Sequence, residues 1–295
     1  MVSGGAVHGG GMTAAGGPGT AARVPAGQAG VVDLGFGGEV AGFYHQYRRG
    51  YPPAVIDTLA GSFGLTGDDI VIDLGCGTGQ LTLPIAARVR AVAGVDPEPD
   101  MLTRARRAAA EHGITNVTWL LGADTDMAAL AALLGNQRAG AVTIGQALHW
   151  MRYRELFPAL PPLLRPGGGV AVVTNGTPLW LQDSPWSQAL RGFLEQWLGT
   201  TLTSACGTDE ASQQRYRDTM TAAGFGVTEA SFEYTDDLDL GHLVGSLYSA
   251  LPVQRLPPPD QRATFADQVR RAVAPHERFT EPVRVRMLLG RAGQT

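Results

Sequence analysis

Lysine is absent from this chain of 295 residues, in which all 23 basic residues are arginines. Without a lysine amine, the chain cannot form a Schiff base with a carbonyl substrate or use lysine as a general base. Cysteine is scarce too, with only Cys76 and Cys206. Two cysteines provide neither a disulfide framework nor a cluster for binding a metal. We therefore expect no metal site and a reducing, cytoplasmic compartment.

Long apolar runs and runs of basic residues are also missing. No window of about 18 residues is apolar throughout, so no membrane-spanning helix is predicted. The formal net charge is −4 at pH 7, and the arginines form no run long enough to follow a phosphate backbone. The expected partner is therefore a small molecule, and neither a nucleic acid nor a membrane. No feature of the sequence indicates an oligomeric state.

The first 34 residues contain few large apolar side chains. Glycine-rich runs such as 9–11 and 16–19 cannot bury enough surface to offset the entropy lost on ordering. The segment also lacks the charged start and the apolar core of a secretion signal. We expect a flexible, glycine-rich tail over residues 1–34 and one domain over residues 35–295.

From residue 70 onward, short β-branched runs alternate with segments of helical period. This alternation predicts a mostly parallel sheet with helices on both faces and right-handed crossovers. The expected strands are 70–72, 90–95, 116–121, 141–144 and 169–173, and the expected helices between them are 80–89, 99–112, 127–134 and 153–164.

The pattern changes after residue 173, where helices become longer and strands fewer. Helices are expected over 179–197, 213–223, 239–251 and 260–273, and strands over 227–234 and 279–289. Two late strands are too few for a sheet of their own, so they should join the first sheet. The predicted fold is α/β, a doubly wound, mostly parallel seven-stranded sheet with helical cap insertions near 178–212 and 237–275.

The turn Asp-Leu-Gly-Cys-Gly-Thr-Gly at 73–79 joins the first strand to a helix. Its glycines allow the backbone to approach a ligand closely, and ligands of open α/β sheets bind at the carboxyl ends of strands. A dinucleotide fingerprint would need glycine at position 80, where this chain has Gln80. Asp73 would crowd a pyrophosphate but suits an ammonium group. Taken alone, the turn is also compatible with a purely structural role.

Two further acidic residues follow the next two strands. Asp96 closes the second strand, where a carboxylate can accept hydrogen bonds from both hydroxyls of a ribose. Asp124 lies in the loop after the third strand, where it could receive the exocyclic amine of an adenine. Each acid alone is more often a helix cap or a solvated loop residue. Three acids at consecutive strand ends predict a site for a nucleoside linked to an amino acid.

These motifs resemble those of the class I S-adenosylmethionine (SAM) dependent methyltransferases, and among them the small-molecule members of the trans-aconitate and quinone types. The resemblance covers roughly residues 40–175. One departure is Arg49, at a position where the pattern has proline. The motifs that carry the resemblance are V-I-D-L-G-C-G-T-G at 71–79, G-V-D-P-E-P-D-M-L at 94–102, L-L-R-P-G-G-G at 163–169, F-Y-H-Q-Y-R-R-G-Y-P at 43–52 and Q-A-L-H-W-M at 146–151.

The resemblance implies a Rossmann-like methyltransferase fold that binds SAM and releases S-adenosylhomocysteine (SAH). It assigns the amino-acid part of SAM to Asp73 and its turn, the ribose to Asp96, and the SAM carboxylate to Arg48. His149 is either a general base for the acceptor's proton or part of the pocket floor. The cofactor-binding residues implied are Tyr44, Tyr47, Arg48, Asp73, Gly75, Cys76, Gly77, Gly79, Asp96, Pro97, Met101, Asp124, Thr125 and Gln146.

The expected function is methyl transfer from SAM to an oxygen, nitrogen or carbon of a small molecule such as a natural-product intermediate in antibiotic biosynthesis. One alternative is an NAD(P)-dependent oxidoreductase, which Gln80 and the missing Tyr-x-x-x-Lys relay disfavour. Another is a SAM-binding protein without catalytic activity. The acidic stretch from Glu229 to Asp239 either attracts a cationic acceptor or forms a solvated strand edge.

Overall fold

The computed structural model describes residues 35–293, while residues 1–34, where the glycine-rich tail is predicted, and 294–295 lie outside the described part. The described chain is built around one sheet of seven strands in the order β3-β2-β1-β4-β5-β7-β6. The strands are β1 (Ile70–Leu74), β2 (Ala91–Asp96), β3 (Val117–Leu121), β4 (Ala139–Gly145), β5 (Leu164–Asn175), β6 (Phe225–Leu238) and β7 (Phe279–Ala292).

The first five strands are parallel, and β7 runs antiparallel to both of its neighbours, β5 and β6. The strand order changes direction beside β1, which lies between β2 and β4. In open sheets of this kind, the ligand crevice lies at the carboxyl ends of the strands near that point. The prediction of a doubly wound, mostly parallel sheet of seven strands is confirmed.

Helices cover both faces of the sheet. Adjacent residues of a strand point to opposite faces, so Val71 packs with one group of helices and Ile72 with the other. Every helix among the described residues is too short or too polar to cross a membrane. The helices on the Val71 face are α2 (Pro53–Phe63) and α3 (Thr82–Ala86), those on the Ile72 face are α5 (Met127–Leu134), α6 (Tyr153–Ala159) and α8 (Glu210–Ala222), and α4 (Pro99–Glu111) contacts β2 and β3.

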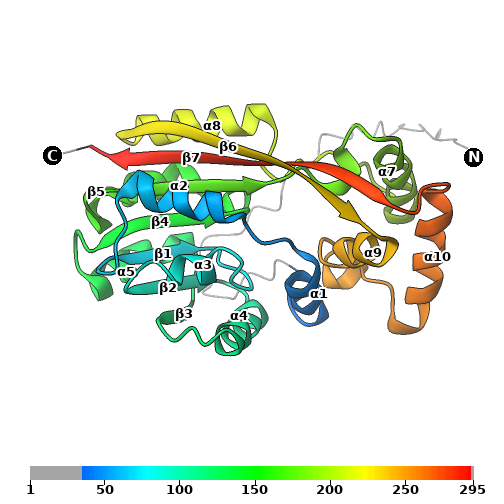
Figure 1. The fold of residues 1–295 in the computed structure, drawn as a ribbon, viewed down its shortest axis with the longest axis horizontal. Helices are drawn as coiled ribbons and strands as arrows, with labels where there is room; N and C mark the ends of the chain where they lie inside the picture. Colours follow the sequence, from blue (N-terminus) through cyan, green and yellow to red (C-terminus); the bar gives the residue numbers. More distant parts are fainter. Residues whose placement is uncertain (1–34, 294–295) are drawn as a thin grey trace, which may run out of the picture. The chain divides into compact units, whose positions relative to one another are not determined.

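A separate helical cluster, called the cap below, is attached to the extended ends of β6 and β7 (Figure 1). The pairing of β5 with β7 stops at Asn175 and Val285, but β6 and β7 remain paired as far as Leu238 and Phe279. This two-stranded extension leads into the cap. Its helices are α7 (Pro185–Leu198), α9 (Leu240–Tyr248) and α10 (Arg262–Ala272), and α1 (Glu39–Tyr47) contacts α9. The insertion boundaries near 178–212 and 237–275 remain predictions.

Several helices differ from those expected. The helix predicted from residue 179 begins only at Pro185, because the Ser184 side chain caps it by accepting from the Ser187 backbone N–H. The helix predicted over 80–89 is only Thr82–Ala86, because positive φ angles extend through Gly79. Helices α1 and α2 were not predicted. The proline at the start of α2 and Gly64 after its end are ordinary helix boundary signals.

Two glycines provide a test of the packing. A Cβ on Gly169 of β5 would lie 2.2 Å from the Gly290 carbonyl oxygen and 2.3 Å from the Phe63 ring. We expect Gly169→Ala to lower the free energy of unfolding by about 1–3 kcal/mol through overpacking. Gly192 of α7 has no atom within 4 Å of that position, so Gly192→Ala should raise it by about 0.5–1 kcal/mol. Urea denaturation measures both, and equal effects would contradict the packing described here.

Candidate functional site

A cavity of about 350 Å³ lies at the carboxyl ends of the strands, between the sheet and the cap. Its volume falls within the range usual for small-molecule sites. The predicted site residues all line it, with two exceptions, Gly79 and Thr125. The sequence motifs and the cavity therefore coincide.

The glycine turn forms the floor of the cavity and is held against β2. The backbone N–H groups of Gly75 and Cys76 both donate to the Val95 carbonyl, at 2.8 and 3.0 Å. A Cβ on Gly75 would lie 2.5 Å from the Cβ of Ala147. On Gly77, at φ +53°, a Cβ would meet only the Tyr44 ring, at 3.7 Å. The turn therefore exposes backbone to the cavity at Gly77, where a ligand can approach closely.

Asp73 precedes this turn and is buried, with 1% of its surface exposed. Its carboxylate accepts hydrogen bonds from the hydroxyls of Thr82, at 2.5 Å, and Thr143, at 2.7 Å. Burial raises the pKa of Asp73 to about 6, although these two hydrogen bonds lower it. The carboxylate therefore joins β1, α3 and β4 beneath the turn and also faces the cavity.

Asp96 connects the end of β2 to the turn. One carboxylate oxygen accepts from the Gly77 N–H at 2.8 Å, and the other accepts from the Glu98 N–H at 2.9 Å. Burial raises the pKa of Asp96 to about 6, against the effect of both hydrogen bonds. Each oxygen still has a lone pair for a further donor. Pro97 and Met101 line the cavity beside it.

The loop after β3 supplies a third acidic residue. Asp124 lines the cavity, and its carboxylate accepts from the Arg152 backbone N–H at 2.7 Å. Thr125 lies in the same short helix, Asp124–Asp126, but does not line the cavity. Gly79 is also outside the wall, because a Cβ at this position would face Leu83 and Trp119. These two predicted residues belong to the supporting turns and not to the cavity surface.

Helix α1 and the residues after it cover the cavity. Tyr44 lies over Gly77, and the Arg48 guanidinium is 5.2 Å from the centroid of the Tyr44 ring. Arg48 Nε donates to Ser249 Oγ at 2.9 Å. Tyr47 packs against Gly245 of α9, where a Cβ would lie 2.4 Å from its ring. This covering segment is therefore held by the cap as well as by the sheet.

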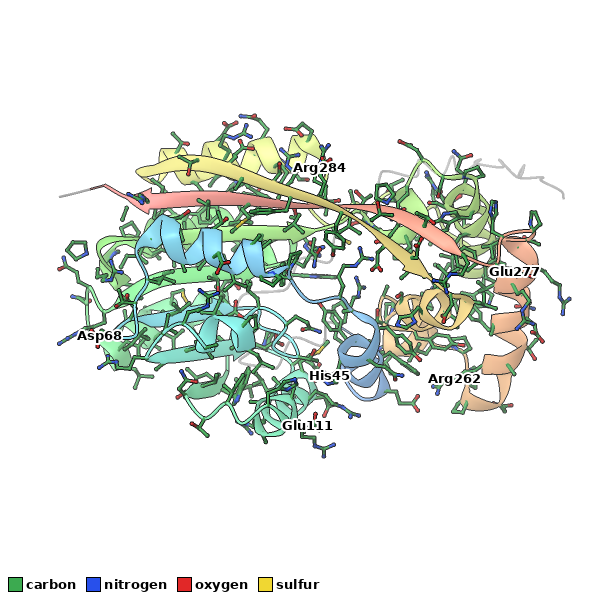
Figure 2. The ribbon with its side chains drawn as sticks, viewed as in Figure 1. His45, Asp68, Glu111, Arg262, Glu277 and Arg284 are labelled. Carbon is green, nitrogen blue, oxygen red and sulfur yellow. The ribbon has the colours of Figure 1, made fainter. Side chains whose placement is uncertain are left out.

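Arg262 makes a further set of contacts between α1 and the cap. Arg262, which is labelled in Figure 2 at the start of α10, forms an ion pair with Glu39 of α1. Its guanidinium also lies 5.3 Å from the centroid of the Phe43 ring and 5.8 Å from that of Tyr248. One arginine thus joins α1, α9 and α10.

Gln146 and His149 follow β4. Gln146 has a positive φ of 52°, and its side-chain amide donates to the Asn175 carbonyl at 3.2 Å. Burial and, to a lesser extent, the charge of Arg48 lower the pKa of His149 to about 4. Within the described part of the chain, His149 makes no hydrogen bond, and its ring contacts that of Trp150. The imidazole is therefore neutral at pH 7 and a weak base.

Arg49 occupies the position where the family pattern has proline. It forms an ion pair with Glu281 of β7, a carboxylate of which 1% is exposed. Gln182, ahead of α7, donates to the same carboxylate at 3.3 Å. The departure from the pattern thus supplies a link between the covering segment and the base of the cap.

Several lining residues were missed by the sequence prediction. Tyr51 belongs to the motif at 43–52 and could have been inferred from it. Arg49, Glu98 and Met151 likewise lie within the quoted motifs. A further group comes from segments that carry no motif and meet only in three dimensions. This group includes Phe36, Asn175, Trp180, Cys206, Thr208, Ser246 and Ala250.

The acidic stretch at 229–239 lies outside the cavity wall. Glu233 forms an ion pair with Arg284, which is labelled on the outer strands in Figure 2. Asp237 accepts from the Thr280 hydroxyl at 2.6 Å, and Asp239 caps α9. These acids hold the two-stranded extension together and do not face a ligand in the cavity.

Residues 71–168 match the family model described as a methyltransferase domain. This range begins in β1 and ends in β5, and it includes every strand end with a cavity-lining carboxylate. This match shows a methyltransferase domain over residues 71–168. Its turn at 73–79 and Asp96 are thus features of a methyltransferase fold.

Relatives and solved structures are similar to this chain over different lengths. Uncharacterized methyltransferases of Mycobacterium bovis and Mycobacterium tuberculosis are 35% identical over 144 residues, 49% of this chain and 53% of theirs. The chain thus spans about half the length of the curated relatives it matches.

A structure from Anaeromyxobacter dehalogenans, described as a candidate type II methyltransferase, has a TM-score of 0.53 at 22% identity, covering 84% of this chain and 98% of that one. The YcgJ protein of Bacillus subtilis has a TM-score of 0.50 at 14% identity, with coverages of 82% and 97%. These two structures support the fold alone.

The raised pKa of Asp73 makes stability depend on pH. The pKa of the folded carboxyl is about 6, above its ordinary value of 3.8. From about pH 4 to pH 6 the carboxyl ionises in the unfolded chain before it ionises in the fold, so stability falls as the pH rises. The full cost of burying the charge is present above about pH 6 and absent below about pH 4. Asp73→Asn keeps the size and lets both threonines bond to the amide. We expect the free energy of unfolding to rise by about 1–3 kcal/mol at pH 7.5, and by less at pH 4.5.

Urea denaturation of the ligand-free protein at both pH values measures this difference. The exposed Asp57, which pairs with Arg88 on the surface, is the matched control, and Asp57→Asn should change little at either pH. A loss of stability in Asp73→Asn at pH 7.5 would show that the two threonine hydrogen bonds outweigh the cost of burying the charge.

The state of His149 can be measured directly by NMR. Since its pKa is lowered to about 4, its imidazole resonances should stay constant from about pH 8 to pH 5.5. The missing resonance of the His149→Gln variant identifies them. A titration near pH 6.5 would contradict this prediction and would favour the interpretation of His149 as a general base.

Proposed function

We propose that this protein transfers a methyl group from SAM to a small-molecule acceptor, with SAH as the second product. The observation that carries the proposal is the junction of Asp96 with Gly77. It combines a carboxylate at the end of β2 with a turn whose backbone faces the cavity. The methyltransferase domain at 71–168 supports the same reaction class.

The cavity residues fit the parts of SAM one by one. The exposed backbone near Gly77 suits the amino-acid part, and the remaining lone pairs of Asp96 suit the ribose hydroxyls. Met101 and Pro97 offer an apolar surface for adenine, with Asp124 at its edge. SAM supplies an electrophilic methyl group bound to a sulfonium.

The chain's own contribution is to position the acceptor and exclude water. Tyr44 covers the turn, while α1 is held closed by contacts with α9 and α10. Holding a nucleophile in line with its target supplies much of the rate acceleration in a displacement. Proton removal by His149 contributes little, because an imidazole with a pKa of about 4 is a weak base.

Calorimetry with SAM tests the proposed site. Asp96→Ala should weaken SAM binding about 10- to 100-fold, since it removes a charged acceptor for the ribose and frees the turn. Asp57→Ala, which removes an exposed carboxylate that does not line the cavity, is the control and should bind SAM as the unaltered protein does. Unchanged SAM affinity in Asp96→Ala would mean that the site is wrongly assigned.

The reaction itself is tested by incubating the protein with labelled SAM and a panel of candidate acceptors. Formation of SAH above background with at least one acceptor is the expected result. Tight binding of NAD(P)H without binding of SAM would instead identify an oxidoreductase. Binding of SAM with no turnover across chemically diverse acceptors would identify a non-catalytic SAM-binding protein.

A further inference from the structure

Tyr51 lies in the short segment between α1 and α2 and lines the cavity. Its ring packs against apolar side chains on the Val71 face of the sheet. The phenolic oxygen reaches the end of β4, where a Cβ on Gly145, the last residue of that strand, would lie 2.7 Å from it. Glycine at position 145 therefore leaves room for this hydroxyl at the strand end.

The hydroxyl of Tyr51 makes no hydrogen bond within the described part of the chain. The nearby carboxylate of Asp73, in contrast, accepts from two hydroxyl groups of the protein. The Tyr51 oxygen is also not sealed from solvent, so a ligand in the cavity can reach it. A tyrosine hydroxyl in a buried environment usually has a partner. The missing partner therefore indicates a bound ligand.

The phenol is neutral at pH 7. Burial and, to a lesser extent, the charges of Tyr44, Asp73 and Tyr234 raise the pKa of Tyr51 well above its ordinary value of 10. The oxygen thus keeps its proton and is a neutral donor and acceptor. It is suited to contact with a positively polarised group of a ligand, which its lone pairs attract.

The strand order relates Tyr51 to the proposed SAM site. Strand β1 lies between β2 and β4. Asp96, at the end of β2, is proposed for the ribose, and the turn after β1 for the amino-acid part. The loop after β4 contacts the turn, since a Cβ on Gly75 would lie 2.5 Å from the Cβ of Ala147. Tyr51, at the end of β4, therefore lies across β1 from Asp96.

A sulfonium sulfur carries three substituents in a pyramidal arrangement. In SAM, two of them lead to the ribose and to the amino-acid part, which are proposed to lie against the end of β2 and the turn after β1. The methyl group is the third, so it points away from both and toward the end of β4. Tyr51 presents its neutral oxygen at this end.

We propose that the hydroxyl oxygen of Tyr51 contacts the methylsulfonium group of SAM and thereby strengthens the binding of SAM relative to SAH. This inference rests on the proposed function. The methyl hydrogens of a sulfonium carry part of its positive charge and form weak C–H···O hydrogen bonds. SAH has neither the methyl group nor the charge. The family resemblance assigns roles to Tyr44, Tyr47 and Arg48 of the same motif, and none to Tyr51.

Calorimetry with SAM and SAH tests the proposal without an acceptor. Tyr51→Phe removes the oxygen and keeps the ring, so SAM should bind about three- to fivefold more weakly while the affinity for SAH stays within about twofold. Tyr153→Phe is the control and should change neither affinity, since Tyr153 packs against Phe157 and Tyr216 and does not line the cavity. Thermal unfolding of each variant confirms that it is folded.

NMR of SAM labelled with carbon-13 in its methyl group gives a second measurement. Contact with an oxygen deshields the methyl hydrogens, so their resonance in the complex should lie further downfield with the unaltered protein than with Tyr51→Phe. The aromatic ring is present in both proteins, so its own effect on the resonance cancels. A hydroxyl that served only in packing would leave this resonance unchanged.

Other results would overturn the proposal. An equal loss of affinity for SAM and SAH in Tyr51→Phe would place the hydroxyl against a part that the two ligands share. Unchanged affinities and an unmoved methyl resonance would show that the hydroxyl faces only water. Failure of the unaltered protein to bind SAM or SAH counts against the proposed function itself and is thereby distinguished from both.

Discussion

The rest of the site depends on the two hydrogen bonds that Asp96 accepts from the backbone N–H groups of Gly77 and Glu98. One bond holds the turn after β1, and the other holds the start of the segment that leads into α4. Together with the Val95 carbonyl, which accepts from Gly75 and Cys76, they fix two neighbouring strand ends at one place. The open backbone at Gly77 is available to a ligand because this junction holds it there.

This junction has a cost in stability that a ligand can offset. Asp73 and Asp96 are both buried, and burial raises the pKa of each to about 6. In the ligand-free protein at neutral pH, both charges are therefore held in unfavourable surroundings. Hydroxyl or ammonium donors from a bound ligand would stabilise the same charges. Groups that weaken the empty fold thus contribute to affinity, as expected where a site is prepared in advance of binding.

The strand ends could be predicted from the sequence, and most of the cap wall could not. Asp73, Asp96 and Asp124 each follow a short β-branched run, so local pattern alone brings them to one edge of a parallel sheet. Trp180 and Cys206 reach the cavity through packing between segments that have no periodic relation to each other. The Arg49–Glu281 pair joins the two ends of the described chain, and its partner could not be inferred from either local sequence.

The wall of the cavity is divided between the sheet and the cap. The acids proposed for SAM lie at strand ends of the central sheet, where β1 and β2 are buried on both faces. The far wall instead depends on the β6–β7 extension, which has no β5 beside it beyond Val285. A shift of that extension would move α9 and the loop ahead of α7 while leaving Asp96 and Gly77 unchanged. Glu281 lies on this extension and pairs with Arg49, so the segment that covers the cavity is coupled to the cap through an ion pair whose carboxylate is buried.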